Sequence, residues 1–282
     1  MTTSLDTSEI RGIPVNANRT LSLSVLSGKG GVGKTTIALN LSLALRREGA
    51  RVLLVDCDLG LANLDVLLGI SPEVTLQDVL ISDVSASAAV HRVEDGLDIL
   101  PAASGVPELV DMTTDMRDML LSRLRPLLGS YDYVFLDLGA GINGTVQTFA
   151  DMSMARVLVV TPEPTAMTDT YAIIKVLAQV HGVRDFLLVV NQTESREEET
   201  ATFRRLHSAC KRFLGVEPML LGGIRQDPKV AEAICRRKPL LQLFPACNAA
   251  GDLVELAKRL MRSREAMSDA LEKRAVLEPS SL

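Results

Sequence analysis

Cysteine is scarce in this chain of 282 residues, which contains four copies of it. No two of them are spaced as C-x-x-C and no histidine cluster accompanies them, which argues against a zinc site or a redox-active dithiol. Scattered free cysteines in a chain of mixed helical and strand pattern are typical of a reducing cytosol. The four residues are Cys57, Cys210, Cys235 and Cys247.

Long apolar runs are also missing. No segment approaches the roughly 18 consecutive apolar residues of a membrane-spanning helix. Residues 1–20 are polar and lack the apolar stretch of a signal peptide. We therefore expect a soluble cytoplasmic protein.

The chain has no excess of basic residues. Lysine and arginine number 30 against 35 aspartates and glutamates, which gives a net charge of −5, and the two signs are mixed along the sequence. A dedicated DNA-binding surface usually shows as a cluster of basic residues, so this composition argues against one. It leaves open a weak or partner-assisted contact with DNA.

Short apolar runs alternate with segments of helical periodicity from residue 21 onwards. Continuous apolar runs are typical of parallel strands that are covered on both faces. We predict an α/β fold, a doubly wound and mostly parallel sheet with helices on both faces. The pattern is least clear over Ser71–Glu94. Strands are expected at Leu21–Leu26, Arg51–Val55, Leu97–Leu100, Tyr133–Leu136, Val157–Val160, Phe186–Val190 and Met219–Ile224. Helices are expected at Thr35–Glu48, Met116–Leu128, Thr168–Val180, Thr200–Phe213, Val230–Arg236 and Leu253–Met261.

The chain shows no internal repeat and no low-complexity linker. This favours one domain, at residues 21–262. A flexible leader at residues 1–20 is expected before it, and a C-terminal helical tail at residues 263–282 after it.

The decisive motif is G-K-G-G-V-G-K-T at Gly28–Thr35, which fits G-x-x-x-x-G-K-[ST] and lies between an expected strand and an expected helix. Its glycines allow successive backbone N–H groups to face a phosphate, and the helix adds its positive end. We expect Lys34 to reach the β- and γ-phosphates of a nucleotide and the Thr35 hydroxyl to ligate Mg²⁺. The expected phosphate-binding residues are Gly28, Gly30, Gly31, Val32, Gly33, Lys34, Thr35 and Thr36.

An aspartate ends a second apolar strand. Asp137 follows Tyr133–Leu136 roughly one hundred residues after the phosphate-binding motif, and glycines follow it. A carboxylate in this position typically holds Mg²⁺, often through water. The glycines behind it would let the backbone move when the terminal phosphate leaves.

A further acidic segment, D-C-D-L-G-L-A-N, follows the strand Arg51–Val55. Side chains at the carboxyl end of a parallel strand lie at the crevice where ligands bind. Because side chains alternate along an extended chain, Asp56 and Asp58 cannot both point directly at one spot, which favours separate roles. The alternative is a polar turn that merely ends the strand.

A second lysine, Lys29, gives the loop the form K-G-G-V-G-K-T, and with it the chain resembles the deviant P-loop ATPases of the MinD/ParA family over roughly residues 21–262. The resemblance implies ATP and Mg²⁺ as cofactors and slow, regulatory hydrolysis. It implies that Lys29 reaches across a face-to-face dimer to the phosphates of the other subunit; the alternative is a solvated loop lysine. It assigns Asp58 to the attacking water, Asp56 to the magnesium shell and Asn63 to the nucleotide-sensing loop.

Two segments concern the choice of base. The resemblance implies that Asn191, in V-V-N-Q, reads the edge of adenine, and that Asp227 and Pro228, in I-R-Q-D-P, belong to a loop that closes over the base. The N-K-x-D motif of GTPases is absent there, which favours ATP over GTP. The alternative for each segment is an ordinary strand-ending turn.

Within the family, Asp58–Gly69, Leu100–Gly105 and Thr161–Asp169 look most like the flagellar-number regulators of the FlhG/FleN type. This implies an ATP-dependent homodimer that regulates flagellar number or placement through partners, either a signal-recognition-type GTPase or a flagellar transcription activator. Residues 1–20 contain no D-Q-A-x-x-L-R motif, a departure that puts stimulation of a partner GTPase in doubt.

Relatives often end in an amphipathic helix that binds the inner membrane. Here Leu253–Met261 carries apolar residues at helical spacing, but the tail at residues 263–282 has no aromatic residue and charges of both signs. A membrane-surface helix usually has bulky apolar residues opposite a basic face. This favours a helix packed on the protein core, with peripheral membrane association as the alternative.

Three other functions on the same scaffold remain as alternatives. A ParA-type DNA-partition ATPase shares the core motifs and would need a basic surface. An iron–sulfur carrier would need bridging cysteines, which the spacing does not offer. A metabolic ligase would need an inserted substrate pocket, and no insertion is evident.

Overall fold

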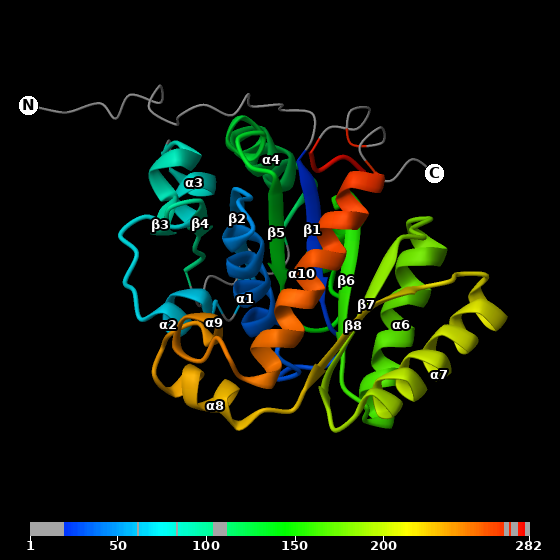
Figure 1. Ribbon diagram of the computed structural model, residues 1–282. Helices are drawn as coiled ribbons and strands as arrows, with labels where there is room; N and C mark the ends of the chain where they lie inside the picture. Colours follow the sequence, from blue (N-terminus) through cyan, green and yellow to red (C-terminus); the bar gives the residue numbers. More distant parts are fainter. Residues whose placement is uncertain are drawn as a thin grey trace, which may run out of the picture.

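The computed structural model describes residues 20–60, 62–82, 84–103, 112–267, 271 and 276–279. Within them, eight strands form one sheet in the order β3-β4-β2-β5-β1-β6-β7-β8 (Figure 1). Every neighbouring pair is parallel except β3 with β4, which confirms the predicted α/β fold. The strands are β1 (Leu21–Leu26), β2 (Val52–Cys57), β3 (His91–Glu94), β4 (Leu97–Leu100), β5 (Tyr133–Leu138), β6 (Ala155–Val160), β7 (Phe186–Thr193) and β8 (Met219–Arg225). The α-helices are α1 (Lys34–Arg47), α2 (Leu64–Leu68), α3 (Leu76–Ile81), α4 (Thr114–Leu128), α5 (Gly144–Met152), α6 (Pro164–Val180), α7 (Arg196–Leu214), α8 (Pro228–Cys235), α9 (Leu240–Leu243) and α10 (Asn248–Ala266).

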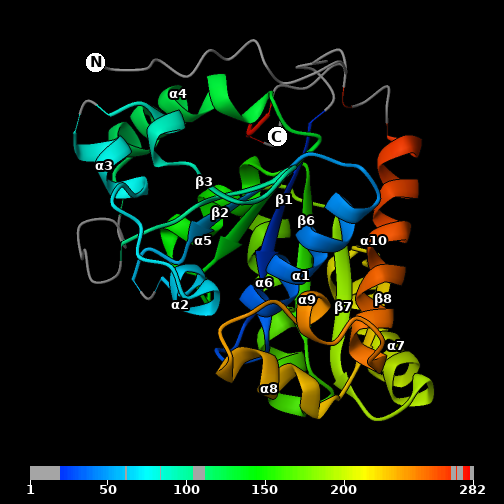
Figure 2. The same ribbon diagram turned by 60° about the vertical axis from the view of Figure 1, so that its left-hand side comes forward.

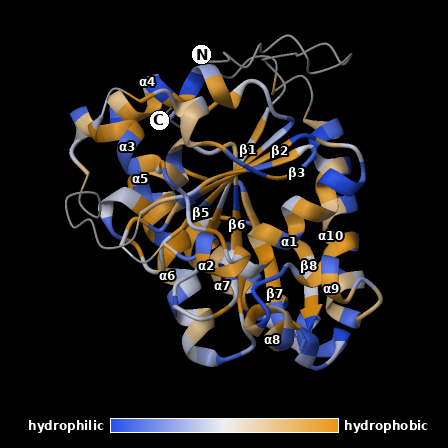
Figure 3. Cartoon of the chain, turned by 90° about the vertical axis from the view of Figure 1, so that its left-hand side faces the viewer, coloured by the Kyte–Doolittle hydropathy of each residue, from blue (hydrophilic) through white to orange (hydrophobic). Residues whose placement is uncertain are grey.

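Two hydrophobic clusters cover the two faces of the sheet. Alternate residues of each inner strand belong to opposite clusters: Val52 and Leu54 of β2 pack on one face, and Leu53 and Val55 on the other. Helices α1 and α10 lie together over the first face, while α4 to α7 cover the second (Figures 1 and 2). Hydropathy follows this layering, with apolar strands inside and hydrophilic residues on the outer sides of the helices (Figure 3). Burial on both faces explains the continuous apolar runs in the sequence.

Each expected strand is present, but β2, β5, β7 and β8 end later than expected. Strands β2 and β5 extend past Val55 and Leu136, so that Asp56 and Asp137 lie within the sheet and directly opposite each other. The expected strand ends were wrong because both carboxylates keep the backbone pairing of the strands that precede them. The two side chains are nevertheless at the carboxyl edge of the sheet, where the phosphate-binding loop also begins.

Several helix starts also differ from those expected. Helix α6 begins at Pro164 rather than Thr168, because proline is well suited to the first turn of a helix. Helix α7 begins at Arg196 rather than Thr200, since the side chain of Ser195 accepts a hydrogen bond from the backbone N–H of Glu198. Periodicity alone does not detect such polar first turns.

The unclear segment Ser71–Glu94 contains only short elements. Helix α3 begins with a capping box, in which the Asp78 carboxylate accepts hydrogen bonds from the backbone N–H and the hydroxyl of Thr75, each at 2.8 Å. A 3₁₀ helix at Ala86–Ala89 and the antiparallel edge strand β3 follow. Elements of four to six residues are too short to show a hydrophobic period.

The apolar face of α10 is occupied. Leu253, Leu256, Ala257 and Leu260 are at most 2% exposed and pack against α1 and β8. These residues therefore do not face a lipid surface in this arrangement. Further along, Leu271 is buried in the same cluster as they are. In the part of the chain that the structure describes, no helix combines the length and apolar character needed to cross a membrane.

Candidate functional site

The phosphate-binding loop joins β1 to α1 with two residues in the left-handed region. Gly31 has φ = 77° and Gly33 has φ = 95°, conformations that favour glycine. A Cβ at Gly33 would lie 2.6 Å from Nδ2 of Asn191, and one at Gly28 would lie 2.3 Å from Cβ of Asp169. Nothing lies within 4 Å of a Cβ built at Gly30 or Gly31. The loop is thus packed on one side and open on the other, the form of a cradle.

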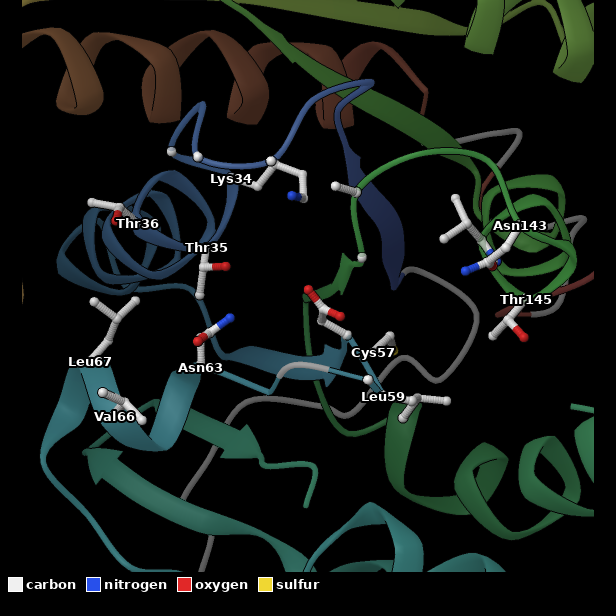
Figure 4. A pocket seen from close by; sticks show the side chains of 18 of the residues that line it. Lys34, Thr35, Thr36, Cys57, Leu59, Asn63, Val66, Leu67, Asn143 and Thr145 are labelled. Carbon is white, nitrogen blue, oxygen red and sulfur yellow. The ribbon is translucent and has the colours of Figure 1, made fainter. Parts of the chain in front are cut away.

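This open side faces a cleft of about 650 Å³. Figure 4 shows the side chains of Lys34, Thr35 and Asn63 directed into the same space. The cleft therefore brings together the loop and the Asp58–Asn63 segment, as expected for a phosphate site. Its lining includes Gly30, Gly31, Gly33, Lys34, Thr35, Thr36, Asp58, Asn63, Gly139 and Asn143.

A second cleft, of about 760 Å³, continues from the first on the other side of the loop. The two share Gly31, Gly33, Thr36 and Ile234. The second cleft is lined by the three residues expected to surround a base, which are Asn191, Asp227 and Pro228. A glycine-rich cradle joined to a second cavity fits the two ends of a nucleotide.

Asp137 is buried behind Thr35, a residue that lines the phosphate cleft. Its carboxylate accepts a hydrogen bond from the Thr35 side chain, and burial raises its pKa to about 6. Its Oδ1 atom has no hydrogen-bond partner. A buried carboxylate oxygen without a partner, beside a threonine hydroxyl, fits the hard oxygen ligands of Mg²⁺. Among the described residues no group of three or more Cys, His, Asp or Glu could hold a metal ion, so a cation here would also need phosphate or water ligands.

Asp56 organises the neighbouring loop. Its Oδ1 accepts the N–H of Asp58 at 3.1 Å, and its Oδ2 accepts the N–H groups of Asn63 at 3.1 Å and Leu64 at 3.3 Å. These bonds close the segment that carries Asp58 and fix the first turn of α2. Burial, followed by the charge of Asp137, raises the pKa of Asp56 to about 7. The structure thus gives Asp56 a positioning role that the sequence did not indicate, and its contribution to a magnesium shell stays a prediction.

Asp58 lies against the glycine segment that follows β5. A Cβ at Gly139 would come within 3.1 Å of Oδ1 of Asp58. The absence of a side chain there leaves space for this carboxylate beside the phosphate cradle. The glycines after Asp137 were expected to provide backbone freedom, and the contact shows that Gly139 also provides room.

Lys29 is directed away from its own cleft. Its Nζ donates to Oε2 of Glu163 at 2.7 Å, and the two side chains are 47% and 55% exposed. This hydrogen bond to Glu163 raises the pKa of Lys29. Lys29 lines neither of the two clefts. A loop lysine held outside its own site can reach a phosphate only in another subunit or after it has left Glu163.

Asn191 contacts the loop as well as the base cleft. Its Nδ2 donates to the carbonyl of Val32 at 2.7 Å, which orients the amide and directs Oδ1 elsewhere. Asp227 caps α8 through a 2.9 Å bond from the N–H of Lys229 and also accepts from the N–H of Ala249. Pro228 is the first residue of α8. The residues expected at the base therefore also have structural roles.

Sequence reasoning missed several residues of the phosphate cleft. Asn143 caps α5 by accepting from the N–H of Val146 at 2.9 Å, and it lines the cleft together with Thr145. Both come after the glycine segment, outside any motif. The one signal was an asparagine immediately before a helix, a common N-cap. Leu61, Ser104 and Gly105, which belong to the family-like segments, lie outside the described residues.

The pKa of Asp137 predicts how stability depends on pH. Because its pKa is raised from 3.8 to about 6, the folded protein binds a proton more tightly than the unfolded chain. The stabilisation from this proton is full near pH 4 and is lost as the pH rises through about 6. At roughly 1.4 kcal/mol per pKa unit, the effect is on the order of 3 kcal/mol. Denaturant unfolding of the nucleotide-free protein at pH 5 and pH 8 should show a smaller pH difference for Asp137→Asn than for the wild type.

Asp118→Asn serves as the control, because this carboxylate is 62% exposed and far from the cleft in sequence. Its pH difference should equal that of the wild type. Equal pH differences for the wild type and Asp137→Asn would show that Asp137 is not held in the buried state described here.

Comparison with known proteins identifies the family of the chain. Residues 23–240 match the family model of the CobQ/CobB/MinD/ParA nucleotide-binding domain. The chain is 37% identical over 227 residues to the antiactivator FleN of Pseudomonas aeruginosa, covering 80% of this chain and 81% of that protein. It is 33% identical over 232 residues to the flagellum site-determining protein YlxH of Helicobacter pylori, covering 82% and 78%.

A solved structure shares the fold. The septum site-determining protein MinD of Pyrococcus horikoshii, complexed with Mg-ADP, superposes with a TM-score of 0.72 at 29% identity, over 86% of this chain and 96% of that one. The resemblance to the MinD/ParA family, and within it to the flagellar branch, is confirmed. With a phosphate cradle, a buried carboxylate and this match over most of its length, the chain belongs to the CobQ/CobB/MinD/ParA nucleotide-binding domain family.

Proposed function

We propose that the protein is a Mg²⁺-dependent ATPase whose subunits pair when ATP is bound. The observation that carries the proposal is the position of Lys29, which belongs to the phosphate-binding loop but is held outside its own cleft by Glu163. Every other element of the loop can act within one chain. In this proposal Lys29 completes the phosphate site of a second subunit that faces the first.

The described residues account for binding of the phosphates and the metal. The backbone N–H groups of the open loop and the N-terminus of α1 offer donors to the phosphates, and Lys34 adds a cation. Thr35 and the free oxygen of Asp137 are the expected ligands of Mg²⁺. The bound ion neutralises charge on the phosphates. Uptake of the metal ion requires ionised Asp137, so binding is expected to weaken below about pH 6.

Asp58 is the group best placed to orient the attacking water. It lies in the phosphate cleft, its backbone is fixed by Asp56, and Gly139 leaves space beside its carboxylate. A carboxylate held within reach of a water is a suitable general base. Hydrolysis then removes the terminal phosphate and with it the contact that Lys29 would make in the dimer.

The adenine preference follows from the orientation of Asn191. One N–H of its Nδ2 is donated to the Val32 carbonyl, and its Oδ1, which can only accept, is the atom that we propose faces the base. The 6-position of adenine carries an amino donor, and that of guanine carries an acceptor oxygen. We therefore propose that Asn191 favours ATP over GTP through this single acceptor.

Replacing Asn191 with alanine should weaken ATP binding roughly tenfold, since a buried hydrogen bond of this kind contributes on the order of 1–2 kcal/mol. GTP binding should change much less, so that the ratio of the two affinities approaches one. Titration with fluorescent analogues of ATP and GTP measures both. Gln192→Ala, which changes an exposed neighbour lining the same cleft, is the control. An equal loss of ATP and GTP binding would show that Asn191 only supports the loop.

Pairing is a linkage effect. ATP favours the dimer only as far as it binds the dimer more tightly than the single subunit. In this proposal the contact of Lys29 with the phosphates of the opposite subunit makes ATP bind more tightly to the dimer than to the single subunit. The ion pair between Lys29 and Glu163 opposes pairing, because Lys29 must leave Glu163 to make that contact. The switch therefore depends on the balance between two partners of the same lysine.

The cellular role that we propose is regulation of flagellar number or placement. The support is the similarity to the antiactivator FleN and to the flagellum site-determining protein YlxH. The dimer would act in the cytoplasm, or at the periphery of the inner membrane, on a signal-recognition-type GTPase or a transcription activator. Cells that lack the gene should carry an altered number of flagella by electron microscopy. The wild-type gene should restore the number and Lys34→Ala should not. Unchanged counts in the deletion strain would contradict this role.

A further inference from the structure

A group of exposed basic side chains lies at the end of α8, outside the nucleotide clefts. We define the basic patch as Arg92, Arg236, Arg237 and Lys238, all of which are exposed. Three of them are consecutive in a chain whose net charge is −5, so the patch is a local reversal of the overall charge. Helices α2, α8 and α9 lie at the same end of the molecule (Figures 1 and 2).

The backbone at Arg237 is unusual for a side chain of this kind. The N–H of Lys238 donates to the carbonyl of Ala233 at 3.2 Å, which closes the end of α8, and Arg237 between them has φ = 52°. Helix ends of this form usually place glycine in the left-handed position because it carries no Cβ. An arginine here is strained, and strain of this sort is often retained where the side chain has a function.

Two cations of the patch are available to a ligand. Arg236 is paired with Glu232, and Arg92 lies 3.6 Å from Asp98. Neither Arg237 nor Lys238 forms an ion pair with any residue in the described part of the chain. The patch therefore offers unneutralised positive charge to solvent.

A small cleft of about 130 Å³ lies beside the patch. Lys238 and Arg92 line it on the polar side, and Leu68, Ile70 and Pro239 line its apolar side. Its size and mixed lining suit one or two side chains of a peptide. A nucleic-acid backbone would instead call for a broad basic surface, and the rest of this chain is acidic.

We propose that the basic patch and this cleft bind an acidic segment of a partner protein, in which carboxylates meet Arg237 and Lys238 and an apolar side chain enters the cleft. Charge complementarity of this kind steers association and selects the partner. The interaction adds a docking surface to the proposed switch.

The patch is connected to the nucleotide site through two elements. Helix α2 follows the Asp58–Asn63 segment, and a Cβ at Gly69, at its end, would lie 3.5 Å from Cβ of Arg237. Helix α8 begins beside the base cleft, and its residue Ile234 lines both clefts. A shift of either element on nucleotide binding therefore changes the patch. This dependence on nucleotide rests on the proposed function, whereas docking of the acidic segment does not.

The test uses the full chain and a fluorescein-labelled peptide of alternating glutamate and leucine, with its lysine–leucine counterpart and a short DNA duplex as probes. Fluorescence anisotropy should show binding of the acidic peptide that weakens as salt is raised. Arg237→Gly, which suits the backbone at that position, combined with Lys238→Ala should weaken it by roughly tenfold or more. Arg204→Ala, which removes an exposed charge on α7, should leave it unchanged.

Failure of the acidic peptide to bind would overturn the proposal, as would equal binding by the wild type and the double variant. Binding of the DNA duplex with the same dependence on Arg237 and Lys238 would overturn it in favour of a nucleic-acid surface. ATP hydrolysis by the double variant should equal that of the wild type. The two proposals fail in different experiments. If the ATP switch is wrong, the Lys29 and Asp58 variants will show it, and the acidic peptide will still bind in the absence of nucleotide.

Discussion

Replacing Lys29 with alanine is expected to lower the rate of ATP hydrolysis by a factor of about 10³ or more, the range measured when a cation supplied in trans is removed from a phosphoryl-transfer site. The reason is that Lys29 lies outside its own cleft and, in the proposed dimer, would supply charge to the opposite subunit. Affinity of the single subunit for nucleotide should change little, because Lys34 and the loop backbone remain. Phosphate release and titration with a fluorescent ATP analogue measure the two quantities separately.

Lys211→Ala is the matched control for this prediction. Lys211 is also exposed and also forms an ion pair, with Oε1 of Glu217 at 3.0 Å, but it lies on α7 away from the loop. Its replacement should leave hydrolysis unchanged. If Lys29→Ala hydrolyses ATP at the wild-type rate, Lys29 has no role in trans.

Glu163→Gln tests the opposing contact. Because an exposed ion pair is weak, loss of this one should favour ATP-dependent pairing only by roughly two- to fivefold for each subunit. The gain should shrink as salt is raised, since salt already screens the pair in the wild type. A dimerisation titration by analytical ultracentrifugation at low and high salt measures it. Weaker pairing in Glu163→Gln would mean that Glu163 serves the dimer directly.

The second large effect is expected for Asp58→Ala. Loss of the group that orients the water should lower the hydrolysis rate by roughly 10²–10⁴-fold. ATP binding should persist, because Asp58 forms no part of the phosphate cradle itself. A single-turnover assay should show ATP retained on the protein, with the dimer lasting correspondingly longer.

Asp65→Ala serves as the control for Asp58→Ala. Asp65 is a nearby carboxylate in the first turn of α2, and it does not line the phosphate cleft. Its replacement should leave turnover close to that of the wild type. Comparable hydrolysis by wild type and Asp58→Ala would assign the water to another residue, with Asn143 a polar candidate on the cleft wall.

The fold was largely predictable because the sheet is buried on both faces. Runs such as Val157–Val160 and Phe186–Val190 are apolar at every position, and several such runs in one chain are typical of a parallel sheet covered by helices on both faces. The phosphate-binding loop was predictable because its chemistry requires glycines, a lysine and a threonine at fixed spacing.

The contacts between loops were not predictable. Asp56 accepts hydrogen bonds from three backbone N–H groups, and Asn191 donates one to Val32. These bonds join segments of the sequence that no helical or strand periodicity relates. The pairing of Lys29 with Glu163 spans 134 residues of sequence and depends on the adjacency of β1 and β6. Arg237 in a left-handed backbone position likewise leaves no trace in hydrophobic patterning.

The central claim is that ATP joins two subunits through Lys29, and static light scattering tests it most directly. The wild type and Asp58→Ala would be measured with ADP and with ATP plus Mg²⁺. The account predicts a mass near 30.4 kDa with ADP for both proteins, and about twice that value with ATP, retained longer by Asp58→Ala. A mass that is the same with ADP and with ATP, in both proteins, would contradict it.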